Sequence, residues 1–151
     1  MNRKQKRRIA QRYLEKIEEL NTKIRIKKEC LAETKATLGM RARGYSERVQ
    51  TSVSMDGVCD AVIELLELED EIGESTLNYL KQKERIVTEL FSMENRVYID
   101  ILSYRYLKGK SFEYIAGKVG YTYRHIQRKH EEALVAFYDE VLRKREKRQG
   151  N

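Results

Sequence analysis

The run Thr122–Arg128, with sequence TYRHIQR, contains side chains that can recognise nucleic acid. Arginine donates paired hydrogen bonds to O6 and N7 of guanine in the major groove, and glutamine forms the matching pair with adenine. Arg124, Gln127 and Arg128 are three or four positions apart, so a helix would display them on one face. The spacing therefore predicts a helix whose exposed face reads the bases of duplex DNA.

Residues around this run suit contacts with the DNA backbone. Thr122 and the free N–H groups at a helix start can hold a phosphate, and Tyr123 can stack on a base or contact a phosphate. Lys108 and Lys118 can add further backbone contacts. The complete predicted DNA-binding set is Lys110, Thr122, Tyr123, Arg124, His125, Gln127, Arg128 and Lys129.

Capping and turn residues predict how this face is positioned. Ser111 begins a short helix over 112–119, because its side chain can accept bonds from free N–H groups. Gly120 ends that helix, and Thr122 caps a longer helix from 123 to about 145. Both helices have a core face, formed by Ile115, Ala116, Val119, Ile126, Ala133, Leu134 and Phe137. Two helices joined by a short glycine-containing turn are typical of the helix–turn–helix motif.

Two long amphipathic helices are predicted upstream, over about 3–38 and 56–91. Seam positions recur in both with spacings of four and three, and most are apolar or aromatic, as in coiled coils. They are Tyr13, Ile17, Leu20, Ile24, Lys27, Leu31, Thr34 and Leu38, and then Val58, Val62, Leu65, Glu69, Ile72, Thr76, Tyr79, Lys83, Ile86 and Leu90. We expect an antiparallel hairpin of the two helices, or a parallel coiled coil between two chains.

A third helix is predicted over about 94–108, where Gly109 ends it. The connection 39–55 contains Ser, Thr, Val and Gly, which lower its helix propensity. We therefore expect this connection to be a solvated loop, or a basic arm that orders on nucleic acid or on a partner.

The charges are unevenly distributed. Residues 1–50 contain 15 Lys and Arg against 6 Asp and Glu, a net charge of +9. Residues 51–103 contain 4 against 12, a net charge of −8, and residues 104–151 contain 12 against 6, a net charge of +6. Two basic ends therefore flank an acidic middle. This distribution favours pairing of a basic with an acidic helix, binding of a polyanion by the basic ends, or both.

The run Tyr104–Leu134 resembles the helix–turn–helix of sigma-factor region 4. More closely, it is similar to the ArpU/RinA-type regulators of phage late transcription. The matching residues are Arg105-Tyr106-Leu107, Gly109-Lys110-Ser111, Ile115-Ala116, Gly120–Tyr123, His130 and Ala133-Leu134. The upstream stretch 47–52 and the acidic helix also look like these proteins, so the resemblance covers roughly residues 45–138.

The resemblance implies a phage or prophage transcription regulator that switches on late genes. By position, the resemblance implies that five residues contact DNA as in sigma-like recognition helices, namely Thr122, Tyr123, Arg124, Gln127 and Arg128. One residue departs from the pattern, because Lys129 lies where those helices usually have an apolar side chain. Either the helix is rotated slightly, or the lysine stem follows the core edge with its amine in solvent.

Other residue patterns argue against catalysis, metal binding and membrane insertion. His125 and His130 are five positions apart, which is not the spacing of a helical metal pair, and His130 is expected to pack or hydrogen-bond. Acidic residues between Glu64 and Glu74 would point in several directions on a helix. We expect neither enzyme activity nor a cofactor or metal. Cys30 and Cys59 lack metal spacing and, without an apolar span or a secretory leader, indicate a reduced cytoplasmic protein.

The sequence as a whole predicts an all-α protein with a helical hairpin or coiled-coil oligomerisation region at 1–92 and a helix–turn–helix DNA-binding domain at 93–151. One small helix–turn–helix buries too little surface for tight specific binding, so we expect a homodimer or higher homo-oligomer that assembles through the long seams. Two alternatives stay open. One is a small terminase subunit that recognises packaging-site DNA, and the other is an adaptor that binds host RNA polymerase without its own DNA specificity.

Overall fold

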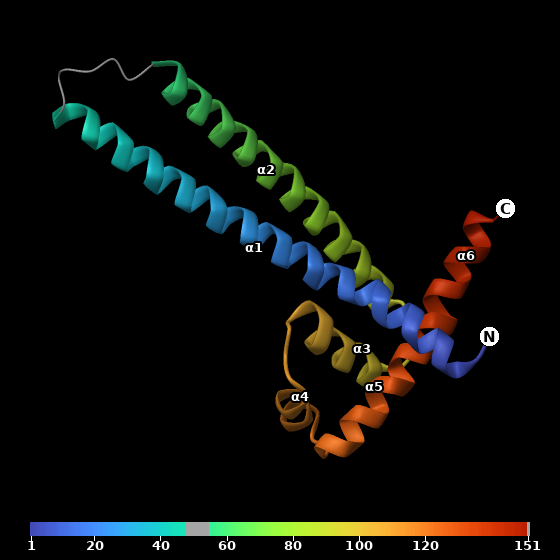
Figure 1. Cartoon of the computed structure of the whole chain (residues 1–151). Helices are drawn as coiled ribbons and strands as arrows, with labels where there is room; N and C mark the ends of the chain where they lie inside the picture. The colour runs from blue at the N-terminus through green and yellow to red at the C-terminus, as the bar shows by residue number, and fades with distance from the viewer. Residues whose placement is uncertain (48–54, 151) are drawn as a thin grey trace. The chain divides into compact units, whose positions relative to one another are not determined.

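The computed structural model describes residues 1–47 and 55–150, with side chains described except at 41–47, 55, 56 and 58. All regular elements within these residues are helical, and none is a strand, which confirms the expected all-α class. The elements, shown in Figure 1, are α1 (Arg3–Glu47), α2 (Met55–Phe91), α3 (Arg96–Leu102), η1 (Ser103–Leu107), α4 (Phe112–Val119), α5 (Tyr123–Phe137), η2 (Tyr138–Leu142) and α6 (Arg143–Gln149). The two η segments are single wide π-helical turns within longer helices, where α3 continues into η1, and α5 into η2 and α6.

The first helix is longer than the sequence predicts. Helix α1 continues through Gly39 to Glu47, so the predicted loop is wrong over 39–47. Met, Arg and Ala in this stretch favour a helix, and each of its two glycines opposes it by only about 1 kcal/mol. The remainder of the predicted connection, 48–54, lies outside the described residues.

The chain forms two compact units. One, the terminal unit, combines Met1–Glu19 with Leu80–Asn151, and the other, the helix-pair unit, is Leu20–Tyr79. The sequence places a domain boundary between residues 92 and 93, whereas the helix ends 1–19 and 80–92 pack in the same unit as the predicted DNA-binding domain. The assignment of separate functions to 1–92 and 93–151 stays a prediction.

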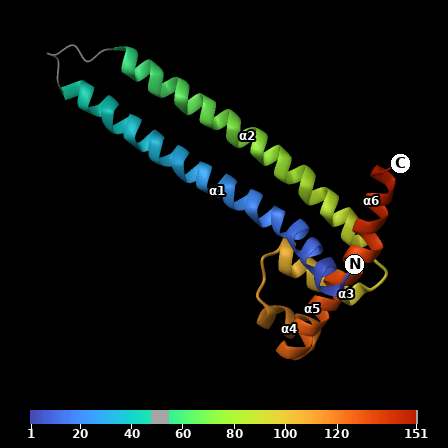
Figure 2. The ribbon, with the colours of Figure 1, turned by 45° about the vertical axis from the view of Figure 1, so that its right-hand side comes forward.

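The two segments of the helix-pair unit lie side by side and run antiparallel, as Figure 1 and Figure 2 both show. The Nζ atom of Lys27 lies 3.2 Å from the Ser75 hydroxyl and 3.6 Å from the Glu71 carboxylate. Lys35, further along α1, pairs at 2.7 Å with Glu69, which comes earlier in α2. These contacts place the basic segment against the acidic one. The predicted seam residues Ile24 and Ile72 are buried within this unit.

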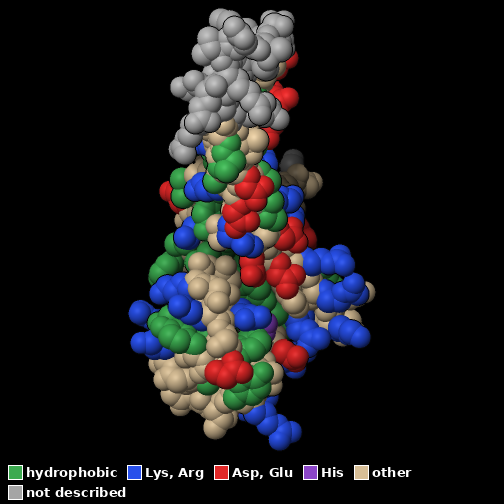
Figure 3. All heavy atoms as spheres, turned by 60° about the vertical axis from the view of Figure 1, so that its left-hand side comes forward, with side chains coloured by type: hydrophobic (Ala, Val, Ile, Leu, Met, Phe, Trp, Pro, Cys, Tyr) green, Lys and Arg blue, Asp and Glu red, His purple; other side chains and the backbone are tan. Residues whose placement is uncertain are grey.

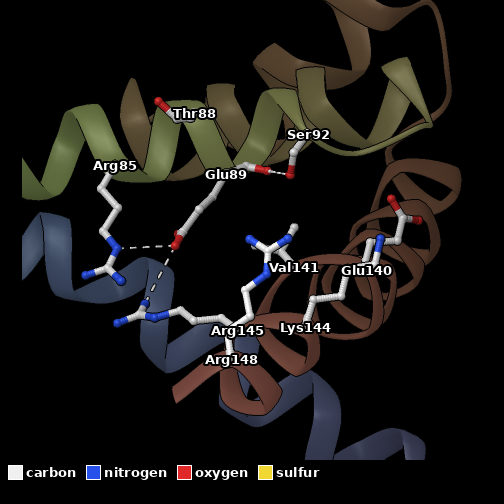
Figure 4. Close-up of a pocket in the computed structure, with 9 residues that line it drawn as sticks. All are labelled: Arg85, Thr88, Glu89, Ser92, Glu140, Val141, Lys144, Arg145 and Arg148. Carbon is white, nitrogen blue, oxygen red and sulfur yellow. Dashed lines mark hydrogen bonds and ion pairs between the residues drawn. The ribbon is translucent and has the colours of Figure 1, made fainter. Parts of the chain in front are cut away.

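One carboxylate joins three helices within the terminal unit. Figure 4 shows Arg85 of α2 and Arg145 of α6 converging on Glu89, at 3.3 and 3.6 Å. The Tyr13 hydroxyl of α1 donates to the same carboxylate at 2.6 Å and accepts from Arg145 at 2.9 Å. Burial, and then the bond to Glu89, raise the pKa of Tyr13 to about 12, so its phenol stays protonated. These bonds join the start of the chain to its end.

Arg85, Glu89 and Arg145 also line a cavity of about 450 Å³. Its lining combines four cations with two carboxylates, and is formed by Arg85, Thr88, Glu89, Ser92, Glu140, Val141, Lys144, Arg145 and Arg148. Glu89 pairs with two of the arginines, and the two carboxylates together offset half of the positive charge within the protein. We therefore interpret this cavity as a structural junction between helices.

Candidate nucleic-acid interface

Local capping fixes the turn between α4 and α5 as the sequence predicts. The Ser111 hydroxyl accepts a bond from the Tyr114 N–H, and α4 ends at Gly120, which has φ +76°. In this left-handed conformation glycine avoids the Cβ clash that other residues meet. The Thr122 hydroxyl then accepts a bond from the His125 N–H at 3.3 Å and starts α5. Both predicted caps and the predicted helix end are confirmed.

A small core holds α4 and α5 against α3. The side chains of Ile101, Ile115 and Ile126 are fully buried and cluster with Ala116. Partly buried residues surround this cluster, namely Val97, Tyr104, Phe112 and Val119. Burying an isoleucine side chain stabilises a fold by about 1.5–3 kcal/mol, so this cluster sets the orientation of α5. With Ile126 directed inward, the opposite face of the helix is left to solvent.

The predicted base-reading residues lie on that exposed face. Arg124, Gln127 and Arg128 are all exposed, and the Tyr123 side chain is 44% exposed. The Gln127 amide donates to the Tyr123 hydroxyl at 3.1 Å, one turn back along the helix. The structure thus brings these four side chains together at the start of α5. Arginine and amide donors on one exposed helix face match the chemistry of major-groove base edges.

His125 lies beside this face and is held by its neighbours. Its ring stacks on Tyr121 with centroids 4.6 Å apart, and its Nδ1 atom lies 3.4 Å from a guanidinium nitrogen of Arg128. The ring is partly exposed. These contacts limit the rotation of both His125 and Arg128, which reduces the conformational entropy lost when either binds a ligand.

Lys129 points away from the exposed face and is paired within the protein. Its ammonium lies 2.9 Å from the Glu132 carboxylate and 5.8 Å from the Tyr98 ring centroid. The bond from Lys129 lowers the pKa of Glu132, and the same bond raises the pKa of Lys129. Its stem follows the core edge, as one of the two sequence alternatives proposes, but its amine binds Glu132. A DNA contact by Lys129 stays a prediction. To make such a contact, Lys129 would have to leave Glu132.

Lys110 belongs to a cationic and aromatic face beside α4. Its ammonium lies 5.0 Å from the ring centroid of Tyr114, which Lys118 approaches at 5.8 Å. Lys108 lies 4.6 Å from the ring centroid of Tyr104, and the two tyrosine rings meet edge to face at 5.9 Å. All three lysines are exposed. This face therefore combines positive charge with ordered lysine stems.

His130 is partly buried and packs against neighbouring rings, in agreement with its predicted packing role. Its Nε2 atom lies 3.0 Å from the Tyr106 hydroxyl, and its ring meets that of Phe112 at 5.0 Å. Burial, followed by the charges of Arg105 and Arg7, lowers the pKa of His130 to about 4. The imidazole is therefore neutral near pH 7 and is a part of the core that supports α5.

The basic start of α1 packs in the same unit as α5, which sequence reasoning did not identify. Arg7 pairs with Glu131 at 2.6 Å, and Lys6 pairs with Asp139 at 2.8 Å across 133 positions. Arg8 and Arg12 are exposed and form no ion pair within the described residues. The opposite charges of the two segments are visible in the sequence, but nothing local indicates that they meet. These arginines are further candidates for phosphate contacts.

The described residues also show whether the chain has groups suited to a metal site or a helix suited to a membrane span. No group of three or more His, Cys, Asp or Glu side chains is arranged to hold a metal ion. No helix in this part of the chain is long and apolar enough to cross a bilayer. Comparison of the sequence and structure with family models, curated proteins and solved structures finds no match.

Proposed function

We propose that this protein is a sequence-specific DNA-binding regulator of transcription that inserts the exposed face of α5 into the major groove. The observation that supports this most directly is the division of α5 into two faces. Arg124, Gln127 and Arg128 are exposed at the start of the helix, while Ile126 is fully buried on the other side. Base readout requires a helix whose one face is held by the protein core and whose other face exposes hydrogen-bond donors to the DNA.

The local architecture around α5 supports a helix–turn–helix motif. In this proposal α4 and α5 are its two helices, and the glycine turn between them sets their crossing. The N–H groups at the start of α5 hold a phosphate together with Thr122, and Lys110 contacts the backbone nearby. We also propose that the long helices α1 and α2 form the antiparallel hairpin that the sequence predicts. The base contacts supply specificity, and the lysines supply salt-dependent affinity.

The sequence resemblance makes the proposal more specific. Together with sigma-like residues at the start of α5, it favours a phage or prophage activator of late genes that acts in the cytoplasm of a bacterial host. The same resemblance makes host RNA polymerase a candidate partner. The adaptor alternative predicts no DNA sequence preference, so a DNA-binding experiment separates it from our proposal. The small-terminase alternative also predicts specific DNA binding, and a ring of about eight or more subunits in light scattering would favour it.

The test begins with selection of bound sequences from a random duplex pool. Binding of the selected duplex is then measured for Arg124→Ala and Arg128→Ala, each of which should lose about 1–3 kcal/mol and relax the preference at one base position. Arg143→Ala is the matched control, since it removes the same charge from an exposed site on α6. Selection of no preferred sequence, with retention of RNA polymerase by the protein, would support the adaptor and contradict our proposal.

A further inference from the structure

Helix α2 has a second apolar stripe that no described residue of its own unit covers. The side chains of Ile63, Leu66 and Leu77 are 53%, 53% and 59% exposed. Each lies one position after a seam residue of α2 and is therefore turned about 100° from the seam. Ile63 and Leu66 are three positions apart, and Leu77 follows Leu66 by eleven. These positions belong to one heptad pattern, and Asp70 and Gly73 occupy the two heptad positions between Leu66 and Leu77. Exposed leucines at heptad spacing are typical of a helix that packs against another helix.

The predicted assembly surface is different from this stripe. The sequence predicts assembly through the seams, but seam residues such as Ile24 and Ile72 are buried within the chain's own helix-pair unit. Lys27, also a seam residue, bonds to Ser75 and Glu71 in the same unit. The seam positions around Ile24, Lys27 and Ile72 are thus occupied within one chain, although the seam residue Val62 near the other end of the unit is 39% exposed. An assembly of chains through the middle of this unit therefore needs another surface.

Charge complementarity identifies what would cover the stripe. Within 57–79 helix α2 has seven acidic residues and no Lys or Arg, whereas 20–40 of α1 has five Lys and Arg against two Glu. Among the residues that the structure describes, two ion pairs join these segments, Lys27–Glu71 and Lys35–Glu69. The carboxylates nearest the stripe, Glu67, Asp70 and Glu74, are exposed and form no ion pair within the described residues. The stripe therefore suits a basic helix surface.

A basic row of this kind lies on α1 of the same unit. Arg25, Lys28, Ala32 and Lys35 each follow a seam residue by one position. In an antiparallel helix pair, such positions on both helices face the same side. One side of the unit therefore presents a basic row with a small residue at its middle, next to an apolar stripe with acidic edges. Figure 3 shows hydrophobic and acidic side chains next to one another on this part of the molecule, below the grey atoms.

We propose that the helix-pair unit associates with a second copy of itself through this side. The stripe of each α2 packs along the basic row of α1 from the other copy, and the four segments form a bundle. A two-fold axis parallel to the helices makes both contacts equivalent, because it places each acidic, apolar α2 beside a basic α1. The lysine and arginine stems cover the leucines. The ammonium of Lys28, which forms no ion pair within the described residues, reaches the unpaired carboxylates, whereas Arg25 and Lys35 exchange Glu29 and Glu69 for them. This proposal does not depend on DNA binding.

The test uses two reciprocal charge reversals in the full chain, without DNA. Variant A is Glu67→Lys with Glu74→Lys on α2, and variant B is Arg25→Glu with Lys28→Glu on α1. We expect each variant alone to dimerise at least about tenfold more weakly than the wild type in sedimentation equilibrium, because like charges then face each other. An equimolar mixture of A and B should recover the wild-type dimer, since both contacts of the mixed pair again join opposite charges.

Controls separate this arrangement from misfolding and from other contacts. Lys23→Glu with Glu64→Lys reverses exposed charges on other faces of the same helices and should leave the dimer unchanged. Circular dichroism checks that every variant keeps its helix content. A monomeric wild type, a variant B that dimerises normally, or a mixture that stays monomeric would overturn the proposal, and the second result would point to a contact between two α2 helices.

Discussion

The partly buried His130 should make the stability of the protein fall when the pH is lowered through a defined window. The pKa of His130 is about 4 in the folded chain, against 6.5 for an unperturbed histidine. Between these values the unfolded chain binds a proton at this residue and the folded chain does not. The free energy of unfolding is therefore unaffected above pH 6.5 and decreases as the pH falls from 6.5 to 4.

The size of the effect follows from the pKa difference. Each pKa unit corresponds to 1.36 kcal/mol, so a shift from 6.5 to about 4 corresponds to a loss of about 3 kcal/mol at pH 4. This is a large fraction of the stability of a small domain. The loss arises mainly because a charged imidazole would be buried among Tyr106 and Phe112, with two arginines nearby.

Urea unfolding followed by circular dichroism at pH 7.5, 6, 5 and 4 measures this loss. Acidic groups also titrate in this range, so the informative quantity is the difference between the wild type and His130→Gln, which keeps a polar partner for Tyr106 but cannot titrate. This difference should change by about 3 kcal/mol between pH 7.5 and pH 4. Equal pH dependence in the wild type and His130→Gln would refute the reasoning.

Three further predictions concern the turn and the exposed face of α5. Gly120→Ala should destabilise the protein by about 1 kcal/mol in urea unfolding, since φ is +76° there, whereas Gly117→Ala in the interior of α4 should be neutral or stabilising. Thr122→Ala should cost about 1 kcal/mol and Thr122→Ser much less, because only the alanine variant removes the cap of α5; equal losses would argue against the cap. The affinity for duplex DNA should fall linearly with the logarithm of salt concentration, and Lys110→Ala should reduce that slope by about 1, while an unchanged slope would exclude a phosphate contact at this residue.

Elements defined by local signals could be predicted from the sequence. Ser111, Gly120 and Thr122 each act on backbone within three or four positions, and all three have the predicted roles. The alternation of buried and exposed residues along α5 likewise follows from its period, which places Ile126 inside and Arg124 outside. The geometry of the candidate site was therefore largely readable from one short stretch of sequence.

Features that depend on distant contacts could not be predicted in the same way. The pairing of Lys6 with Asp139 joins residues 133 positions apart, and many other acidic residues offer the same chemistry. The pair of Lys129 with Glu132 is different, because the two residues are three positions apart on α5 and the sequence offered this partner. Only the contact of Tyr98 with this pair depends on the packing of α3 on α5. The extension of α1 through Gly39 shows that weak helix breakers do not outweigh favourable neighbours.

Methylation interference at guanine N7 on a selected duplex tests the central claim most directly, because this atom lies in the major groove where an arginine would donate to it. If α5 reads the bases there, methylation of at least one guanine in the selected sequence will block binding of the wild type. Arg124→Ala or Arg128→Ala will bind that duplex more weakly but will no longer respond to the methyl group. A wild type that selects a sequence yet binds the N7-methylated duplex normally would contradict the assignment of α5 as the reading helix.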